Sequence, residues 1–170
     1  MIFVTVGTHE EQFNRLVEYM DKLRGANIID EDVIIQTGFS TYEPKYCRWQ
    51  KLYPYHTMIE MVEKARIVIT HGGPSSFFMP LQVGKIPIVV PRQKAFGEHV
   101  NNHQLDFARK VAQRQKSIIV IENIEDLKHT VLNYEDITKL MSPEITSNNA
   151  AFNDNFKQIV NEIFEKRKKP

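Results

Sequence analysis

The chemistry in this chain is concentrated at residues 71–76, His-Gly-Gly-Pro-Ser-Ser, which follow an apolar run at 67–70. A strand that leads through glycines into a helix presents backbone N–H groups and a positive dipole end, which suit a phosphate. Gly72 and Gly73 would let a diphosphate approach the backbone, while Ser75 and Ser76 would cap the helix or bond a phosphate oxygen. The segment therefore indicates a nucleotide or nucleotide-sugar ligand. The alternative is that it is only a turn and a helix cap.

Several other predicted loops carry polar residues and glycines in the same way. In an open parallel sheet, ligands bind outside the carboxyl ends of the strands, where the loops after the strands converge. These loops hold Gly7-Thr8-His9-Glu10, Thr37-Gly38, Tyr53-Pro54-Tyr55-His56 and residues 92–104. The repetition of polar residues across several loops favours a ligand site over an isolated turn.

The elements that must position these loops alternate along the chain between short apolar runs and segments of helical period. Predicted strands cover residues 2–6, 33–36, 67–70, 86–90 and 117–121, with a short one between 46 and 53. Predicted helices cover residues 13–23, 57–64, 75–83, 100–112 and 124–132. Almost wholly apolar strands separated by helices predict an α/β fold, a Rossmann-like parallel sheet with helices on both faces.

Composition narrows the class of protein. The chain has 170 residues, 42% of them hydrophobic and 25% charged, which fits one compact domain. A formal net charge of +1 gives no reason to expect a nucleic-acid partner. The single cysteine, Cys47, excludes an internal disulfide and a cysteine-cluster metal site. No apolar run approaches ~18 residues and no signal peptide opens the chain, so we expect a cytoplasmic protein.

Other phosphate and metal motifs are missing. The first predicted loop lacks the second and third glycines of G-x-G-x-x-G, and G-x-x-x-x-G-K-[ST] does not occur, which disfavours a dinucleotide dehydrogenase and a P-loop NTPase. His71, His99 and His103 lack H-E-x-x-H spacing. His99 and His103 would share one helix face four residues apart, but no acidic third ligand is evident, so no metal is expected.

The end of the chain differs from the rest. After a linker-like stretch at 142–149, six apolar residues fall on one face of an otherwise polar helix. They are Phe152, Phe156, Ile159, Val160, Ile163 and Phe164. We divide the chain into a ligand-binding domain at 1–141 and a linker with an amphipathic helix at 142–170. That helix packs back on its own domain or contacts a partner protein.

Four motifs in order carry a resemblance to a known family. They are V-G-T at the end of the first strand, V-I-T-H-G-G-P-S-S, K-I-P-I-V-V-P-R and N-H-Q-L-D-F-A. Over residues 1 to about 132 the chain resembles the C-terminal, donor-binding half of GT-B glycosyltransferases, within the family 28 group that includes MurG. The likeness is closest to stand-alone catalytic subunits: the small subunit of the dolichol-linked UDP-GlcNAc transferase and bacterial capsular or exopolysaccharide enzymes of the PssE/EpsF type.

The resemblance implies roles for particular residues. Gly72, Gly73, Ser75 and Ser76 would hold the donor diphosphate, with Gly7, Thr8 and His71 completing that site. Asn102, His103 and Gln104 would reach the sugar hydroxyls with Glu98 nearby, and Tyr53 to Tyr55 would border the uracil. The family commonly has a ribose-binding glutamate where this chain has Met79. Either Glu98 substitutes for it, or the ribose is held less tightly.

The resemblance also implies a reaction and a partner. It implies an inverting, metal-independent transfer of a hexose from a UDP-sugar, with no cofactor. A complete GT-B enzyme has an acceptor domain, and this chain opens on the first strand of the donor domain, so we expect a membrane-associated partner subunit that presents a lipid-linked sugar. The helix at 148–164 is the candidate contact. The partner would recruit the chain to the inner face of the cell membrane for surface polysaccharide synthesis.

A base is needed to activate the acceptor hydroxyl. His9 or Glu10 is the expected base, because the first loop faces the cleft where an acceptor arrives. The alternative is that Glu10 and Glu11 only favour a helix N-terminus.

The sequence is compatible with three functions. The first is a nucleotide-sugar transferase subunit. The second is a relative that binds the nucleotide sugar but has lost catalysis, and Met79 is the feature that supports it. The third is some other Rossmann-like nucleotide binder.

Overall fold

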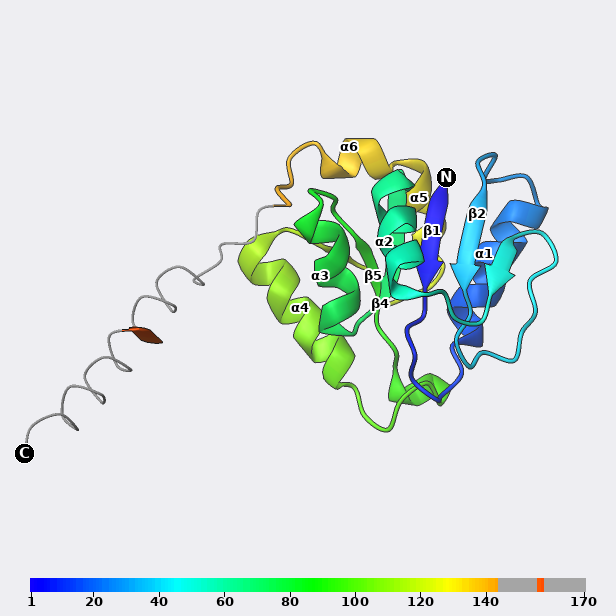
Figure 1. The fold of residues 1–170 in the computed structure, drawn as a ribbon, viewed down its shortest axis with the longest axis horizontal. Coiled ribbons are helices and arrows are strands. Elements are labelled where there is room, and N and C mark those ends of the chain that lie inside the picture. Colours follow the sequence, from blue (N-terminus) through cyan, green and yellow to red (C-terminus); the bar gives the residue numbers. More distant parts are fainter. Residues whose placement is uncertain (144–155, 158–170) are drawn as a thin grey trace, which may run out of the picture.

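A computed structural model describes residues 1–143 and residues 156–157 (Figure 1). Its strands are β1 (Ile2–Thr5), β2 (Val33–Gln36), β3 (Arg48–Gln50), β4 (Ile67–His71), β5 (Ile88–Val90) and β6 (Ile119–Val120). Its helices are α1 (Asn14–Gly25), α2 (Tyr55–Lys64), α3 (Pro74–Gln82), the 3-10 turn η1 (Lys94–Phe96), α4 (His103–Gln115), α5 (Asp126–Leu132) and α6 (Tyr134–Thr138).

The six strands form one sheet in the order β3-β2-β1-β4-β5-β6, and every neighbouring pair is parallel. This confirms the predicted α/β Rossmann-like fold. β1 pairs with β2 on one side and with β4 on the other, so the strand order reverses direction between β1 and β4. Ligands of open α/β sheets bind at the carboxyl ends of the strands at such a switch point. Here the loops at that point follow Val6 and His71.

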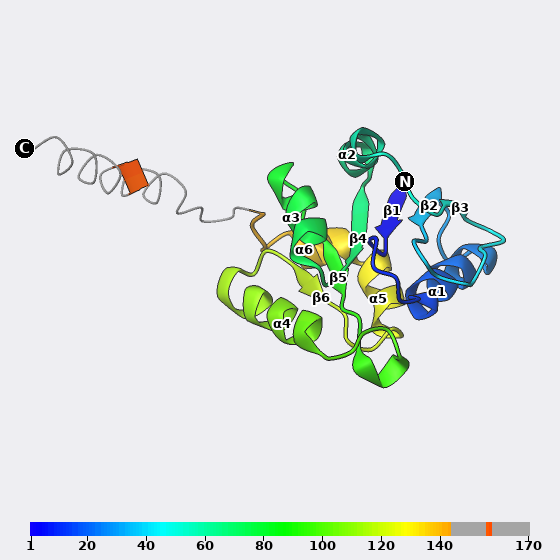
Figure 2. The ribbon, with the colours of Figure 1, turned by 60° about the horizontal axis from the view of Figure 1, so that its bottom comes forward.

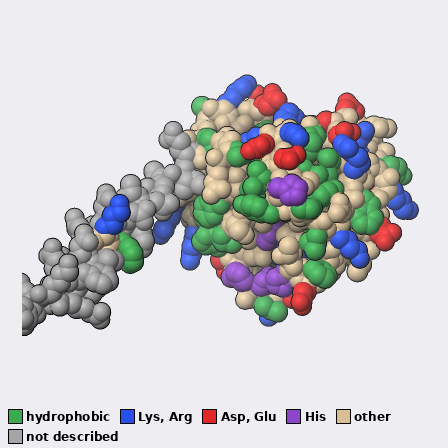
Figure 3. Space-filling view, viewed as in Figure 1, with side chains coloured by type: hydrophobic (Ala, Val, Ile, Leu, Met, Phe, Trp, Pro, Cys, Tyr) green, Lys and Arg blue, Asp and Glu red, His purple; other side chains and the backbone are tan. Residues whose placement is uncertain are grey.

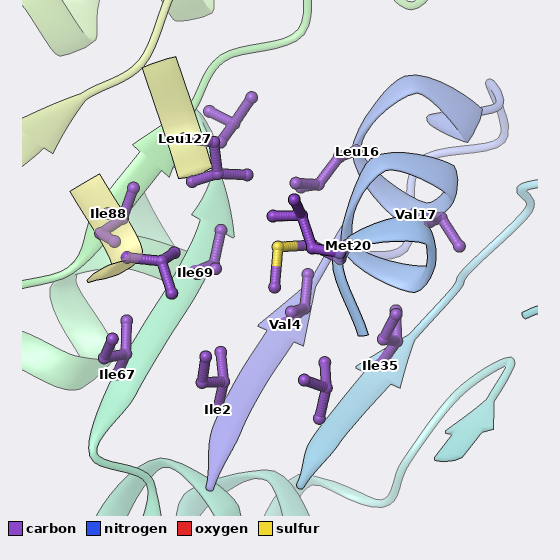
Figure 4. Close-up of a cluster of buried hydrophobic side chains, with 14 of the residues drawn as sticks. Ile2, Val4, Leu16, Val17, Met20, Ile35, Ile67, Ile69, Ile88 and Leu127 are labelled. Atoms are coloured by element: carbon purple, nitrogen blue, oxygen red, sulfur yellow. The ribbon is translucent and has the colours of Figure 1, made fainter. Parts of the chain in front are cut away.

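One face of the sheet is covered by α1 and α5. Alternate residues of the central strands, such as Ile2, Val4, Ile67 and Ile69, point to this face because successive strand side chains point to opposite sides. They pack against Leu16, Val17 and Met20 of α1 and Leu127 of α5 (Figure 4). This cluster is the largest part of the core.

The intervening residues face α2, α3 and α4 on the other side of the sheet. Phe3 and Val68 pack with Val62 of α2. Phe77 of α3 packs with Val89 of β5 and with residues of α4. Figure 2 shows α1 and α2 on opposite sides of β1. Helices therefore cover both faces, as the apolar character of the strands predicts.

The structure shifts several element boundaries. α2 begins at Tyr55, because Pro54 supplies the entry to the helix, so Tyr55 and His56 lie in a helix rather than a loop. α4 begins at His103 rather than at residue 100, which leaves residues 97–102 in the loop. β5 begins only after Pro87, whose carbonyl accepts from the N–H of Ile119. The short helix α6 was not predicted.

The connection from β2 to β3 contains no helix, unlike the other crossovers between neighbouring parallel strands. The side chain of Asp21, on α1, holds the second half of this connection instead. The buried carboxylate of Asp21 accepts hydrogen bonds from the Tyr42 hydroxyl and from the N–H groups of Lys45, Tyr46 and Cys47, at 2.8–2.9 Å. These bonds lower the pKa of Asp21 although burial, the largest influence, acts in the opposite direction.

The predicted amphipathic helix at 148–164 and most of the 142–170 segment lie outside the described residues, so the domain division stays a prediction. Within the described part of the chain, no helix has the length and apolarity needed to cross a membrane.

Candidate functional site

The imidazole of His71 occupies the centre of the switch point. His71 ends β4 and is 9% exposed. A Cβ atom added at Gly7 would lie 2.3 Å from its Nε2, and one added at Gly73 would lie 2.2 Å from its Cε1. Gly7 also has a φ of +76°, which L side chains rarely adopt. Glycine at 7 and 73 therefore lets the ring fit between the loop after β1 and the start of α3.

The hydrogen bonds of His71 fix its protonation state. The N–H of Gly73 donates to Nδ1 at 2.9 Å, so the hydrogen of the neutral ring lies on Nε2. Nε2 lies 2.9 Å from the Ser76 hydroxyl oxygen and donates to it. Burial, with the positive charge of Arg92 as the second cause, lowers the pKa of His71 to about 4. The ring is therefore neutral at pH 7, and the Ser76 hydroxyl keeps its own hydrogen for a further acceptor.

The start of α3 offers fewer backbone donors than the sequence predicts. The N–H of Gly73 is bonded to His71, Pro74 has no N–H, and the N–H of Ser76 donates to the Gly73 carbonyl at 3.0 Å. Only Ser75 among these residues has a backbone N–H without a partner in the described part of the chain. The anion-binding groups at the start of α3 thus include the Ser75 N–H, the hydroxyls of Ser75 and Ser76, and the helix dipole.

The predicted sugar-contacting residues separate into two sets. Gln104 is buried, and its Oε1 accepts a hydrogen bond from the N–H of Arg92 at 3.3 Å. A Cβ atom added at Gly72 would lie 2.9 Å from the Cβ of Gln104, so the two residues are in close contact. Asn102 and His103 are exposed at the start of α4. The Asn102 carbonyl oxygen Oδ1 accepts from the N–H of Lys94 at 2.9 Å, which ties η1 to α4. Gln104 therefore supports the turn, while the other two can meet a ligand.

Three histidines lie together above this turn. The ring of His9 lies 5.0 Å from that of His99, which lies 4.6 Å from that of His103. Figure 3 shows histidine side chains gathered along the lower edge of the molecule, at the carboxyl ends of the strands. His99 precedes α4, so the expectation of one shared helix face is wrong; the loop brings the rings together instead. No group of three or more potential metal ligands of the His, Cys, Asp and Glu types occurs among the described residues.

Glu98 has a different environment from the one predicted. Its side chain is completely buried, and both carboxylate oxygens bond Arg15, at 2.8 and 2.9 Å. The N–H of Gln93 also donates to it, at 3.0 Å. A carboxylate held in this way does not reach a sugar or a ribose. We therefore correct the interpretation of Glu98 from a ligand contact to a support of the loop between β5 and α4.

Arg92 is a central residue of the site that the sequence analysis missed. It is completely buried, and its guanidinium donates to four carbonyl oxygens. These belong to Val6, Glu11, Gln12 and Glu98, at 2.9–3.3 Å. Its Cζ also lies 4.8 Å from the centre of the Phe13 ring. Arg92 joins the loop after β1 to the loop after β5, and no local pattern announces such long-range bonds.

The remaining residues that the sequence analysis singled out have different environments. Thr8 and Glu10 are exposed in the loop after β1. Tyr53 is half-buried, its ring centre lies 6.4 Å from that of Phe3, and its N–H donates to Gln36 Oε1 at 3.0 Å. Met79 is partly buried against the cluster of Phe3, Val62 and Val68. Met79 therefore has an apolar packing role.

The sequence of this chain is similar to those of known proteins. A family model described as the glycosyltransferase family 28 C-terminal domain matches residues 1–163. The UDP-N-acetylglucosamine transferase subunit ALG13 of Homo sapiens is 31% identical over 117 residues, covering 65% of this chain and 10% of that protein. ALG13 of Mus musculus is 30% identical over 118 residues, covering 64% and 10%. The chain thus spans about a tenth of the length of these relatives.

A solved structure shows a similar fold. The crystal structure of the glycosyltransferase SnogD from Streptomyces nogalater matches 84% of this chain and 40% of its own, with a TM-score of 0.50 and 17% sequence identity. At this identity the match concerns the fold alone.

Proposed function

The chain belongs to the glycosyltransferase family 28 C-terminal domain family, and we propose that it is the catalytic, donor-binding subunit of a two-component glycosyltransferase. It would move a hexose from a UDP-sugar to a lipid-linked sugar acceptor in surface polysaccharide synthesis, with inversion at the anomeric carbon. The turn between β4 and α3 carries this proposal, because it offers the Ser75 N–H and the hydroxyls of Ser75 and Ser76 where an anionic ligand of such a sheet binds.

Charge stabilisation of the departing diphosphate follows from the same groups. The dipole of α3, the Ser75 N–H and the two serine hydroxyls would stabilise the negative charge without a metal or other cofactor. Asn102 and His103 would contact the hexose, and Tyr53 would border the uracil.

Replacing Ser76 with alanine should weaken UDP binding about tenfold, because it removes one hydrogen bond to a charged oxygen. It should also lower stability, since the buried Nε2–H of His71 loses its acceptor. Ser75→Ala is the matched variant: it should weaken UDP binding but leave stability unchanged. Calorimetric titration and urea unfolding measure both effects. Equal UDP affinity in wild type and both variants would remove these hydroxyls from the site.

His9 or Glu10 remains the proposed base for the acceptor hydroxyl. His9 is exposed, and its Nδ1 accepts a long 3.3 Å bond from the N–H of Glu11, so the ring must release that bond before Nδ1 takes a proton. His9→Ala should lower turnover in the assembled enzyme at least tenfold while UDP affinity stays unchanged. Glu10→Gln is the companion variant. Full turnover in both would place the base on the partner.

A partner subunit is part of this proposal, because the relatives are described as transferase subunits. Phe96 and Val100, in the loop between β5 and α4, are 51% and 69% exposed, which fits a surface covered by another protein. We propose that this partner is membrane-associated and recruits a cytoplasmic chain to the inner face of the membrane.

Removing residues 148–170 should abolish complex formation in co-purification, because the predicted apolar stripe would be the partner contact. A double substitution of polar residues on the opposite face of the predicted helix, Gln158→Ala with Glu165→Ala, should preserve it. Normal pairing of the shortened chain would contradict this assignment.

A binding-only, regulatory subunit is the second candidate function. Met79, which packs into the apolar cluster where the family commonly has a ribose-binding glutamate, favours it. Transfer of labelled hexose, measured with and without the co-expressed partner, separates the two: transfer that depends on this chain's Ser76 supports a catalytic subunit.

A further inference from the structure

A second pocket lies beside the proposed donor site, at the carboxyl ends of β2 and β3. It has a volume of about 390 Å³, within the usual range for small-molecule sites. Its apolar walls come from Phe39, Trp49 and Leu52, and its polar groups include Glu43 and Lys51. None of these residues has a role in the donor site described above.

The pocket walls are fixed before any ligand arrives. Asp21 gathers the far half of the loop that connects β2 to β3, as described above. Asn14 holds the near half: its Oδ1 accepts from the N–H groups of Thr41 and Tyr42, at 2.9 and 3.0 Å. The Trp49 ring is oriented by a 3.1 Å bond from Nε1 to the Pro44 carbonyl. A loop held so firmly without regular structure is typical of a preorganised binding site.

The chemistry of the walls suits a pyranose ring. A hexose presents an apolar C–H face and an edge of hydroxyl groups that both donate and accept hydrogen bonds. Phe39 and Leu52 are 50% and 44% exposed and supply apolar surface for the face of a ring. Glu43 accepts and Lys51 donates, and both are exposed at the pocket.

The loop that lines the pocket touches the loop that carries the proposed base. A Cβ atom added at Gly38 would lie 2.8 Å from the carbonyl oxygen of Gly7, so the two loops touch. Ser40 Oγ accepts from the N–H of Phe13 at 3.1 Å, which joins the pocket to the start of α1. The pocket therefore adjoins the segment that contains the proposed base.

We propose that the pocket lined by Phe39, Trp49, Leu52, Glu43 and Lys51 is a carbohydrate subsite that holds a pyranose of the acceptor. This inference rests on the proposed function, because it assigns the second substrate of the same reaction. It gives the donor subunit a direct part in acceptor recognition.

Titration of the ¹⁵N-labelled full chain, followed by amide chemical shifts, tests the proposal. The probes are methyl β-glucopyranoside, methyl β-galactopyranoside and methyl N-acetyl-β-glucosaminide, with glycerol as a polyol control. At least one glycoside should produce saturable shifts in residues 38–52. Phe39→Ala should weaken that binding about five- to tenfold. Tyr46→Ala, which removes a 62% exposed aromatic outside the pocket, should leave it unchanged.

A separate titration with UDP keeps the two hypotheses apart. UDP shifts at residues 71–76, with no saturable glycoside shifts at 38–52, would overturn the subsite and leave the proposed function standing. Glycoside binding without any UDP binding would support a carbohydrate site but remove the donor function. Equal weakening by Phe39→Ala and Tyr46→Ala would also overturn the subsite. If the amide signals of residues 38–52 shifted only when the partner protein was added, the pocket would be a protein contact. That result would also overturn the subsite.

Discussion

Arg92→Met should lower the free energy of unfolding by about 3 kcal/mol. The methionine can fill much of the space, but four carbonyl oxygens, those of Val6, Glu11, Gln12 and Glu98, lose their donor. Each buried group left unsatisfied costs about 1–3 kcal/mol, and the release of a buried charge offsets part of that sum. Urea unfolding at pH 7 measures the difference.

The same substitution should weaken UDP binding, although Arg92 is buried and does not reach the ligand. The loops that contain Gly7 and Glu98 are joined through its guanidinium, so their positions around His71 depend on it. Arg48→Met is the control: Arg48 forms an exposed pair with Asp32, and its loss should change stability by less than about 0.5 kcal/mol. Wild-type stability of the Arg92 variant would contradict the bridging role.

Lowering the pH from 6.5 to 4 should destabilise the protein by about 3 kcal/mol through His71 alone. The folded-state pKa of His71 is lowered to about 4, mainly by burial, whereas an unfolded histidine titrates near 6.5. Above pH 6.5 the ring is neutral in both states, so the contribution to stability is fully present. Between pH 6.5 and 4, His71 is protonated in the unfolded chain but stays neutral in the folded chain, so the free energy of unfolding falls. Below pH 4 both states are protonated.

A difference experiment isolates this contribution from other acid-sensitive groups. Asp21 and Glu31 have lowered pKa values in the folded state and lose their stabilising effect only as carboxylates protonate at the acid end of this range. His71→Asn removes the histidine, so its unfolding free energy should depend less steeply on pH between 6.5 and 4. His103→Asn, at an exposed position, should keep the wild-type slope. Parallel slopes for wild type and His71→Asn would contradict the buried neutral ring.

Local sequence patterns predicted the parts of this fold that depend on neighbouring residues. Alternation of apolar runs and helical segments predicts the parallel sheet, and the residues that follow each strand predict which loops form its ligand-binding edge. The boundaries are less exact where a proline controls them, as at Pro54 and Pro87. Thus the location of the candidate site could be predicted from the sequence.

The internal support of the site could not be predicted in this way, because it depends on contacts between distant segments. Gly7 and His71 are far apart in sequence, and only the folded sheet shows that glycine at 7 makes room for the ring. Glu98 lies close in sequence to Asn102 and His103, which suggested a shared ligand role. Its partner proves to be Arg15 on α1, and that pairing has no local signature. Asp21 is a similar case, since its four donors all come from another loop.

Isothermal titration of the full chain with UDP, UMP and uridine tests most directly whether the turn between β4 and α3 holds a diphosphate. The Ser75 N–H, the two serine hydroxyls and the α3 dipole all act on phosphate rather than on the nucleoside. UDP should therefore bind at least about tenfold more tightly than uridine, with UMP between them. Equal affinity for the three compounds, or no heat of binding with any of them, would contradict the assignment.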